Sequence, residues 1–236
     1  MKNKLIVSIL IVILVIGLCA CKKGTTDSDS GKDFSEYTKY YNEVLDKHYN
    51  NISDPKSVIV PSEGELGVIE ACKIFEDTSL ENIGYSLIDI NNDEVPELVI
   101  GSSNPDYYAH VKNEIYALYG LKNNIPTPIL EGTARNIYSI TNENKLYNYG
   151  SNNAMNTYFA SYIVSPSLEL EYEHYYFTNQ KEDNINEIGF FHNKTGKLDI
   201  KLSEELNIRP DAFWNIEQKF ADSTISIEFT PFSEYK

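Results

Sequence analysis

The chain has 236 residues and a formal net charge of −15, with 35 Asp and Glu against 20 Lys and Arg. This acidic excess disfavours binding to nucleic-acid phosphates and to anionic lipid surfaces, so we expect no nucleic-acid partner. Three cysteines are too few for a disulfide framework. About 200 residues beyond an N-terminal leader are enough for one domain with a substantial core.

The first 20 residues have the pattern of an export signal. Lys2 and Lys4 precede the apolar run Leu5–Leu18, whose 14 residues fit a signal peptide better than a membrane span of about 20. The segment LCAC that ends at Cys21 resembles the lipobox of bacterial lipoproteins. This resemblance implies that Cys21 becomes the new N-terminus and carries an acyl lipid such as palmitate. A soluble secreted chain and an uncleaved anchor are the alternatives. We expect a signal peptide over residues 1–20 and a protein anchored to the cell membrane outside the cytoplasm.

Residues 21–33 are expected to form a flexible tether. The run KKGTTDSDSGKD has no aliphatic or aromatic residue, and this composition does not favour a packed core. Asp33 and Glu36 then have the spacing of a capping box. Apolar residues recur at helical spacing from Phe34 to about Asn50, which predicts an amphipathic N-terminal helix. We expect a single globular domain over residues 34–236.

A second helix is predicted after the short extended piece Val58–Val60. Ser62 and Glu65 are typical of a helix start, and the apolar residues that follow share one side. Gly64 and Gly67 weaken this prediction, because glycine disfavours a helix.

From Ile83 onward, short apolar runs alternate with turn residues. The predicted strands form successive pairs, namely Tyr85–Ile90 with Glu97–Ile100, Ile115–Leu121 with Ile125–Leu130, Asn136–Ile140 with Lys145–Tyr149, Thr157–Val164 with Leu168–Phe177, and Ile188–His192 with Leu198–Ile200. Successive hairpins with short turns predict an antiparallel meander.

The C-terminal part changes character. Ser203–Leu206 is predicted to be a short helical piece, and Pro210 is predicted to begin a helix through about Ala221. A last alternating strand is predicted over Thr224–Phe229. The helix has one aromatic edge, formed by Phe213, Trp214, Glu217 and Phe220. The predicted fold class is therefore α+β: an antiparallel β meander with an N-terminal amphipathic helix and a C-terminal helix.

An acidic loop between the first two predicted strands has the spacing of a metal site. Oxygen-bearing side chains occupy loop positions 1, 3, 5 and 9, and a backbone carbonyl at position 7 can add another ligand. These positions are Asp89, Asn91, Asp93 and Glu97, with Val95 at position 7. The pattern D-x-N-x-D-x-x-x-E resembles the calcium loops of FG-GAP and VCBS-type repeats. It differs from an EF-hand, which requires a bidentate Glu at position 12, where this chain has Ile100.

The wider context of the loop is also similar to a known group of proteins. The segments IDINNDEVPELVIG, EIYALYGLKNN and LYNYGSNNA resemble uncharacterised lipoproteins of Gram-positive bacteria. The resemblance implies an extracytoplasmic domain with a structural Ca²⁺ site and no assigned reaction. One departure is Glu94 at position 6, where such loops usually place Gly in a left-handed conformation. The alternative is a solvated β-turn whose acidic side chains point into water.

Residues for catalysis are sparse. The four histidines (His48, His110, His174 and His192) share no ligand or catalytic spacing, so each is expected on the surface or as a satisfied core residue. Cys72 is expected to be a buried small hydrophobe. Glu169, Glu171 and Glu173 alternate and are interpreted as a solvent-facing acidic stripe, although they could face other carboxylates as a glycosidase pair would.

The sequence therefore favours a non-enzymatic binding or scaffolding module with a calcium loop. Its expected partners are the membrane, through the lipid, and an envelope glycan or protein. Eighteen tyrosines suit strands, but a glycan-binding module would show some of them as an exposed cluster. The alternative is a cell-envelope hydrolase acting on glycan or peptide polymers. That function predicts a concave pocket with converging carboxylates or a His–carboxylate pair.

Overall fold

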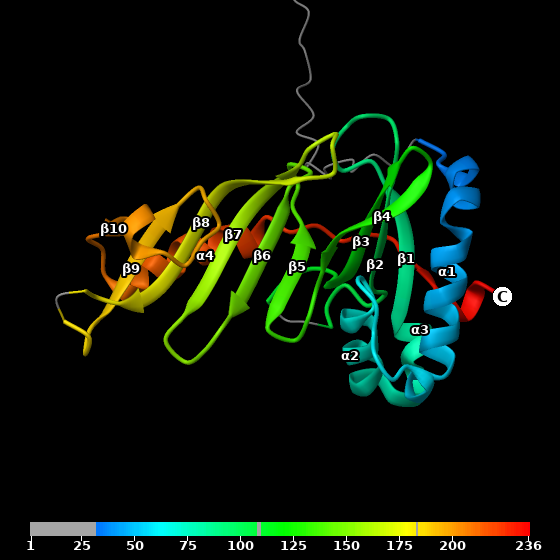
Figure 1. Ribbon diagram of the computed structural model, residues 1–236, viewed down its shortest axis with the longest axis horizontal. Coiled ribbons are helices and arrows are strands. Elements are labelled where there is room, and N and C mark those ends of the chain that lie inside the picture. The colour runs from blue at the N-terminus through cyan, green and yellow to red at the C-terminus, as the bar shows by residue number, and fades with distance from the viewer. Residues whose placement is uncertain (1–31, 108–109, 183) are drawn as a thin grey trace, which may run out of the picture.

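The computed structural model describes residues 32–107, 110–182 and 184–236 (Figure 1). The signal peptide, Cys21 and most of the tether lie outside the described residues. Within these ranges no helix is long and apolar enough to cross a membrane. The helices are α1 (Thr38–Ser53), α2 (Leu66–Phe75), α3 (Ser79–Asn82) and α4 (Pro210–Asp222).

One antiparallel sheet organises the described part of the chain. Its strands are β1 (Ile83–Ile88), β2 (Glu97–Ser102), β3 (Ile115–Lys122), β4 (Ile125–Glu131), β5 (Asn136–Ile140), β6 (Leu146–Ser151), β7 (Thr157–Val164), β8 (Leu170–Gln180), β9 (Ile188–Asn193), β10 (Glu204–Leu206) and β11 (Thr230–Pro231). Their order is β10-β9-β8-β7-β6-β5-β3-β2-β1-β11, and β4 pairs with β3 outside this path. The predicted α+β meander with an N-terminal and a C-terminal helix is confirmed.

Asparagines make the turns of two predicted hairpins. Asn123 and Asn124, between β3 and β4, have φ values of 56° and 62°. Asn144, between β5 and β6, has a φ of 56°. This left-handed region suits Asn better than most residues, and two such residues in a row match the twist of the flanking strands.

Helices α1, α2 and α3 gather at one end of the sheet, around β1–β3 (Figure 1). Tyr41 of α1 is fully buried there, and its phenol donates a hydrogen bond of 2.8 Å to the Pro96 carbonyl at the end of the acidic loop. The buried residues of this cluster are Tyr41, Leu45, Ile52, Val68, Ala71, Cys72, Phe75, Ile83, Leu98, Ile100, Tyr116, Ala117, Tyr119 and Phe232. The N-terminal helix thereby fixes one end of the loop.

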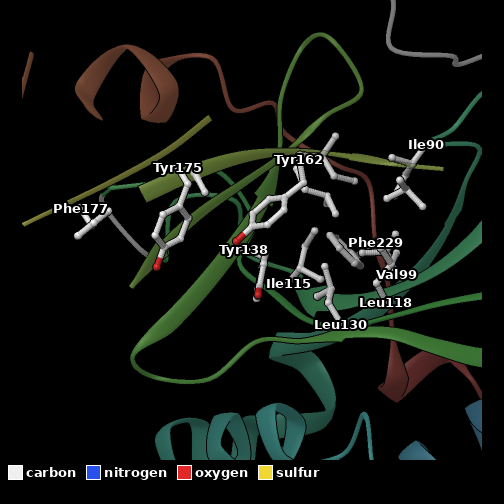
Figure 2. Packing of buried hydrophobic residues seen from close by; sticks show 14 of the residues in the cluster. Ile90, Val99, Ile115, Leu118, Leu130, Tyr138, Tyr162, Tyr175, Phe177 and Phe229 are labelled. Carbon is white, nitrogen blue, oxygen red and sulfur yellow. The ribbon is translucent and has the colours of Figure 1, made fainter. Parts of the chain in front are cut away.

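Helix α4 packs at the opposite end of the sheet, behind β7 and β8 in the view of Figure 1. Phe213 is fully buried, with its ring centroid 4.6 Å from that of Phe190 and 5.1 Å from that of Phe159. A third cluster lies on the opposite face of the sheet from these two and contains Val99, Ile115, Tyr138, Tyr162 and Phe177 (Figure 2).

Two predicted elements after β8 are wrong. Leu198–Ile200 is not a strand, and Ser203–Leu206 is not helical, since β10 covers Glu204–Leu206 and pairs with β9. The reason is the side chain of Asn193, which accepts hydrogen bonds from the backbone N–H groups of Thr195 and Gly196. Its amide also donates to the Lys197 carbonyl. The resulting loop delays the return of the chain to the sheet.

Two predicted boundaries also differ. Thr224–Phe229 is not a continuous strand: Thr224 forms an isolated bridge with Thr141, and the strand itself is the short β11. The backbone N–H of Ile227 instead donates to the Asn113 side chain, because this segment covers the third cluster without pairing along a strand. At the N-terminus, Asp33 accepts a hydrogen bond from Ser35, and a 3₁₀ turn precedes α1.

Candidate functional site

The acidic loop between β1 and β2 is closed by its own side chains. The buried Asp89 carboxylate accepts hydrogen bonds from the backbone N–H of Asp93 at 3.0 Å and of Glu94 at 3.2 Å. The Asn91 side chain also accepts from Asp93, at 3.0 Å, and Asp93 accepts from Val95 at 2.9 Å. These are the local turns that Asp and Asn favour. They bring Asp89, Asn91, Asp93 and Val95 into one curled loop.

The expected left-handed position is present. Glu94 has a φ of 72° and its neighbour Asn92 a φ of 59°. Asn tolerates this region, whereas Glu carries the steric penalty of a Cβ close to its own backbone. The hydrogen bond from Glu94 N–H to Asp89 helps to hold this conformation.

Glu97 lies at the other side of the loop. Its buried carboxylate accepts a hydrogen bond of 2.9 Å from the Ile90 N–H. Burial raises the pKa of Glu97 to about 8, and the negative charges of Asp93 and Asp89 add to this rise. The Lys32 ammonium lies 3.2 Å from Asp89 and supplies positive charge at the loop.

The loop has the oxygen chemistry of a Ca²⁺ site, but several of those oxygens already accept backbone N–H groups. Within the described residues, no three His, Cys, Asp or Glu side chains are grouped to hold a metal ion. An ion would therefore have to replace hydrogen bonds within the loop and offset the Lys32 contact. Metal binding by the five predicted ligands is therefore still a prediction.

The histidines are more connected than their sequence spacing indicates. His48 is a buried core residue whose Nε2 lies 2.9 Å from the Tyr119 phenol, and burial lowers the pKa of His48 to about 4.

Cys72 is buried as expected, and burial raises the pKa of its thiol. Among the alternating acids, Glu169 and Glu171 are exposed, and Glu173 pairs with Lys145 at 3.0 Å.

His110 forms a His–carboxylate pair with Glu217 of α4. The two side chains are 2.6 Å apart, and the Tyr147 phenol donates to the same carboxylate oxygen. The hydrogen bond to Glu217 raises the pKa of His110. The three side chains join α4 to β6 and to the segment before β3. Sequence reasoning missed this pair because 107 positions separate His110 from Glu217.

A different site emerges where β5, β6, β7 and β8 lie side by side. Register places residues of one sheet face in three cross-strand rows, namely Asn136–Gly150–Tyr158–Phe177, Tyr138–Asn148–Ala160–Tyr175 and Ile140–Leu146–Tyr162–Tyr172. Gly150 leaves room for the Tyr158 ring, because a Cβ at Gly150 would lie 2.3 Å from the Tyr158 phenol oxygen. Seven residues of these rows, with Asn152 and the nearby Gly196 and Leu198, line a hollow of about 280 Å³. We call it the Tyr–Asn hollow; its lining residues are Asn136, Tyr138, Asn148, Asn152, Tyr158, Tyr162, Tyr172, Tyr175, Gly196 and Leu198.

A hydrogen-bond network positions the polar groups of the Tyr–Asn hollow. Tyr158 donates to the Asn136 side-chain oxygen at 3.0 Å, and Tyr162 donates to that of Asn148 at 2.8 Å. The Asn136 amide donates to the Tyr138 phenol at 3.1 Å, which leaves that phenol its own proton. In Figure 2 the phenol oxygens of Tyr138, Tyr162 and Tyr175 point to the same side. The hollow therefore offers both hydrogen-bond donors and acceptors.

The tyrosine rings of the hollow are contiguous. Tyr162 and Tyr172 have ring centroids 4.5 Å apart, and Tyr158 is stacked on Tyr175 with centroids 5.6 Å apart. The exposed tyrosine cluster that the sequence leads us to expect of a glycan-binding module is not found here: Tyr138, Tyr162 and Tyr175 are buried, and Tyr158 and Tyr172 are half-buried. A Cβ at Gly196 would lie about 2 Å from the Tyr172 ring, because the loop after β9 closes directly over it.

Comparisons of the chain with known protein families, with curated proteins and with solved structures find no match. The site is therefore interpreted from its own chemistry.

None of the side chains that line the Tyr–Asn hollow carries a charge at neutral pH. Burial raises the pKa of Tyr138 to about 12, so its phenol keeps its proton. An uncharged, amide- and phenol-lined hollow stands out in a chain with a net charge of −15. All five of these tyrosines lie in strands that the sequence predicts, but only the register between the strands shows that they share a face.

Proposed function

We propose that the protein is a lipid-anchored, extracytoplasmic binding module whose Tyr–Asn hollow holds a neutral, hydroxyl-rich ligand such as an envelope glycan. The observation that carries this proposal is the convergence of five tyrosines and three asparagines on one uncharged hollow. The export signal and the lipobox-like Cys21 support the location at the cell envelope.

The chemistry of the hollow suits a sugar ring. Phenols and amides match hydroxyl groups, which both donate and accept hydrogen bonds. The exposed lining of the hollow is mostly polar, so hydrogen bonds rather than ring stacking would contribute most of the binding. The volume of about 280 Å³ lies near the small end of ligand sites, so we expect one or two sugar units to enter and affinity to be modest.

The test is calorimetric titration of the purified protein with neutral oligosaccharides, using cellotriose and tri-N-acetylchitotriose as probes. Tyr158→Phe keeps the ring and removes one phenol, and should weaken binding about five-fold, since one hydrogen bond contributes about 1 kcal/mol. Tyr172→Ala removes a whole ring and should weaken binding further.

The matched control is Tyr176→Phe, in the same strand β8 but on the opposite face from Tyr175. It should bind as the wild type does. The glycan proposal would be overturned if the protein bound neither of the two oligosaccharides nor purified peptidoglycan. Equal weakening in Tyr158→Phe and Tyr176→Phe would show that the ligand binds elsewhere.

A hydrolase is the second candidate, because His110 and Glu217 form the His–carboxylate pair that this function expects. The Glu217 oxygen that meets His110 also accepts a hydrogen bond from Tyr147. The carboxylate is therefore occupied in joining α4 to the sheet, which favours a packing role. For this reason we rank the hydrolase below the binding module.

Calcium binding to the acidic loop is a separate proposal. We expect Ca²⁺ to raise the thermal unfolding midpoint of the purified protein. An ion at about 100 times its dissociation constant would add about 2.7 kcal/mol to stability. Asp93→Asn should abolish this shift: its carbonyl oxygen can still accept the Val95 N–H, but one negative charge is lost. An absent shift in the wild type, or an equal one in Asp93→Asn, would refute the calcium site.

A further inference from the structure

Two histidines meet on the face of β8 and β9 that is turned away from Tyr175. The Nδ1 atom of His174 lies 3.1 Å from the Nε2 atom of His192. His192 is directly opposite Tyr176, so His174 is its diagonal neighbour across the two strands. Diagonal neighbours on one face are within reach of each other when their side chains are large. Both imidazoles are half-buried and therefore accessible.

The separation of these two nitrogens is close to that of two ligands on one metal ion. Neutral imidazoles can share one N–H···N hydrogen bond, but the same two nitrogens can also bind one metal ion. Zn–N bonds of about 2.05 Å at a tetrahedral angle place two ligand nitrogens about 3.3 Å apart. The observed 3.1 Å is close to that separation, and metal binding would displace the shared proton and turn both nitrogen lone pairs to the ion.

A carboxylate stands beside the pair. Glu204 of β10 is directly opposite His192 in the register of β9 and β10. Side chains of directly opposite residues lie on the same face, with Cβ atoms about 4.5–5.5 Å apart. Glu204 is exposed, so its carboxylate can turn to the imidazoles without breaking a core contact. The three side chains come from three adjacent strands.

Space for further ligands lies next to His174. A cavity of about 420 Å³ between α4 and the sheet is lined by His174, Tyr176, Glu173 and Lys219, among others. Glu173 is engaged with Lys145 and Ser161. The cavity therefore gives solvent access to His174 at its wall, whereas His192 and Glu204 lie outside its lining.

We propose that His174, His192 and Glu204 form a binding site for a divalent transition-metal ion, Zn²⁺ or Cu²⁺. Imidazole ligands suit these ions, whereas Ca²⁺ prefers oxygen. Among the described residues, no three His, Cys, Asp or Glu side chains are already grouped around one point. Glu204 would therefore complete the site by changing its rotamer. This site is distinct from both the Tyr–Asn hollow and the acidic loop.

The test is titration of the purified protein with Zn²⁺ alone and with Cu²⁺ alone, by calorimetry, with Ca²⁺ as a comparison ion. We expect one ion per chain, and electron paramagnetic resonance of the Cu²⁺ complex should show coupling to two imidazole nitrogens. His174→Ala and His192→Ala should each weaken binding at least ten-fold. Glu204→Gln should weaken it less.

His110→Ala is the matched control, because it removes an imidazole elsewhere and should leave metal affinity unchanged. Circular dichroism of each variant checks that it is folded. The Cu²⁺ spectrum of the wild type tests the imidazole ligands even if a variant does not fold. No binding of either ion, a spectrum without nitrogen coupling, or equal loss in His110→Ala would overturn the site. Full affinity in Glu204→Gln would overturn the assignment of the third ligand.

Discussion

Phe213→Ala is expected to lower the free energy of unfolding by about 3–5 kcal/mol. Phe213 is fully buried and packs between α4 and the rings of Phe159, Tyr176 and Phe190. Removing its ring leaves a cavity that the stacked aromatic neighbours can fill only in part. Urea unfolding, followed by far-ultraviolet circular dichroism, measures the loss as a lower midpoint at an unchanged slope.

The neighbouring residue provides the control. Trp214 is 39% exposed and touches Phe213 only by an edge contact. Trp214→Ala removes a larger side chain but leaves no buried cavity, so we expect a loss of about 1 kcal/mol or less. Equal losses in the two variants would contradict the packing of α4 described above.

Phe213 and Trp214 also show how much of the burial in α4 can be predicted from the sequence pattern. The aromatic edge predicted for this helix contains Phe213, Trp214, Glu217 and Phe220. In the structure Phe213 and Glu217 are buried and Phe220 is half-buried, whereas Trp214 lies beside the edge and is exposed. Helical periodicity predicts the buried side of α4. Burial of Glu217 was not predictable, because it depends on His110 and Tyr147 from distant parts of the chain.

Local signals predicted most strands but not every pairing. The hairpins β3–β4, β5–β6 and β7–β8 follow from short turns with Asn, Pro or Ser between apolar runs, and each is confirmed. The pairing of β9 was wrong, because the Asn193 loop displaces the next strand to β10. The contact of β1 with β11 joins segments far apart in the chain, and no local pattern indicates it.

The Tyr–Asn hollow depends on an irregularity that the sequence pattern does not contain. Tyr172 and Tyr175 are three positions apart in β8, and an odd spacing places two side chains on opposite faces of a regular strand. The register between β7 and β8 shifts between Ser161 and Tyr162. This bulge turns Tyr172 to the face of Tyr175. Strand propensity alone therefore favoured the interpretation of these tyrosines as ordinary core and cross-strand pairs.

Gly67→Ala is expected to destabilise the protein by about 1–3 kcal/mol or more, although helix propensity alone predicts a gain of about 1 kcal/mol. Gly67 is a buried residue in the first turn of α2. A Cβ there would lie 2.0 Å from the Gly132 carbonyl oxygen and 2.6 Å from that of Tyr116. Both oxygens belong to the backbone of the sheet and the loop beside it, so they cannot rotate away as a side chain could. Helix α2 would therefore have to move away from β3. Urea unfolding measures the effect.

Asn42→Ala is the matched control, at an exposed position of α1. Here the added helix propensity meets no steric conflict, and we expect a gain of a few tenths of a kcal/mol. The same glycine that weakens the sequence-based prediction of a second helix is thus what lets that helix approach the sheet. A Gly67→Ala variant as stable as the wild type would show that α2 does not make this close backbone contact. Opposite signs in the two variants would separate helix propensity from packing in one measurement.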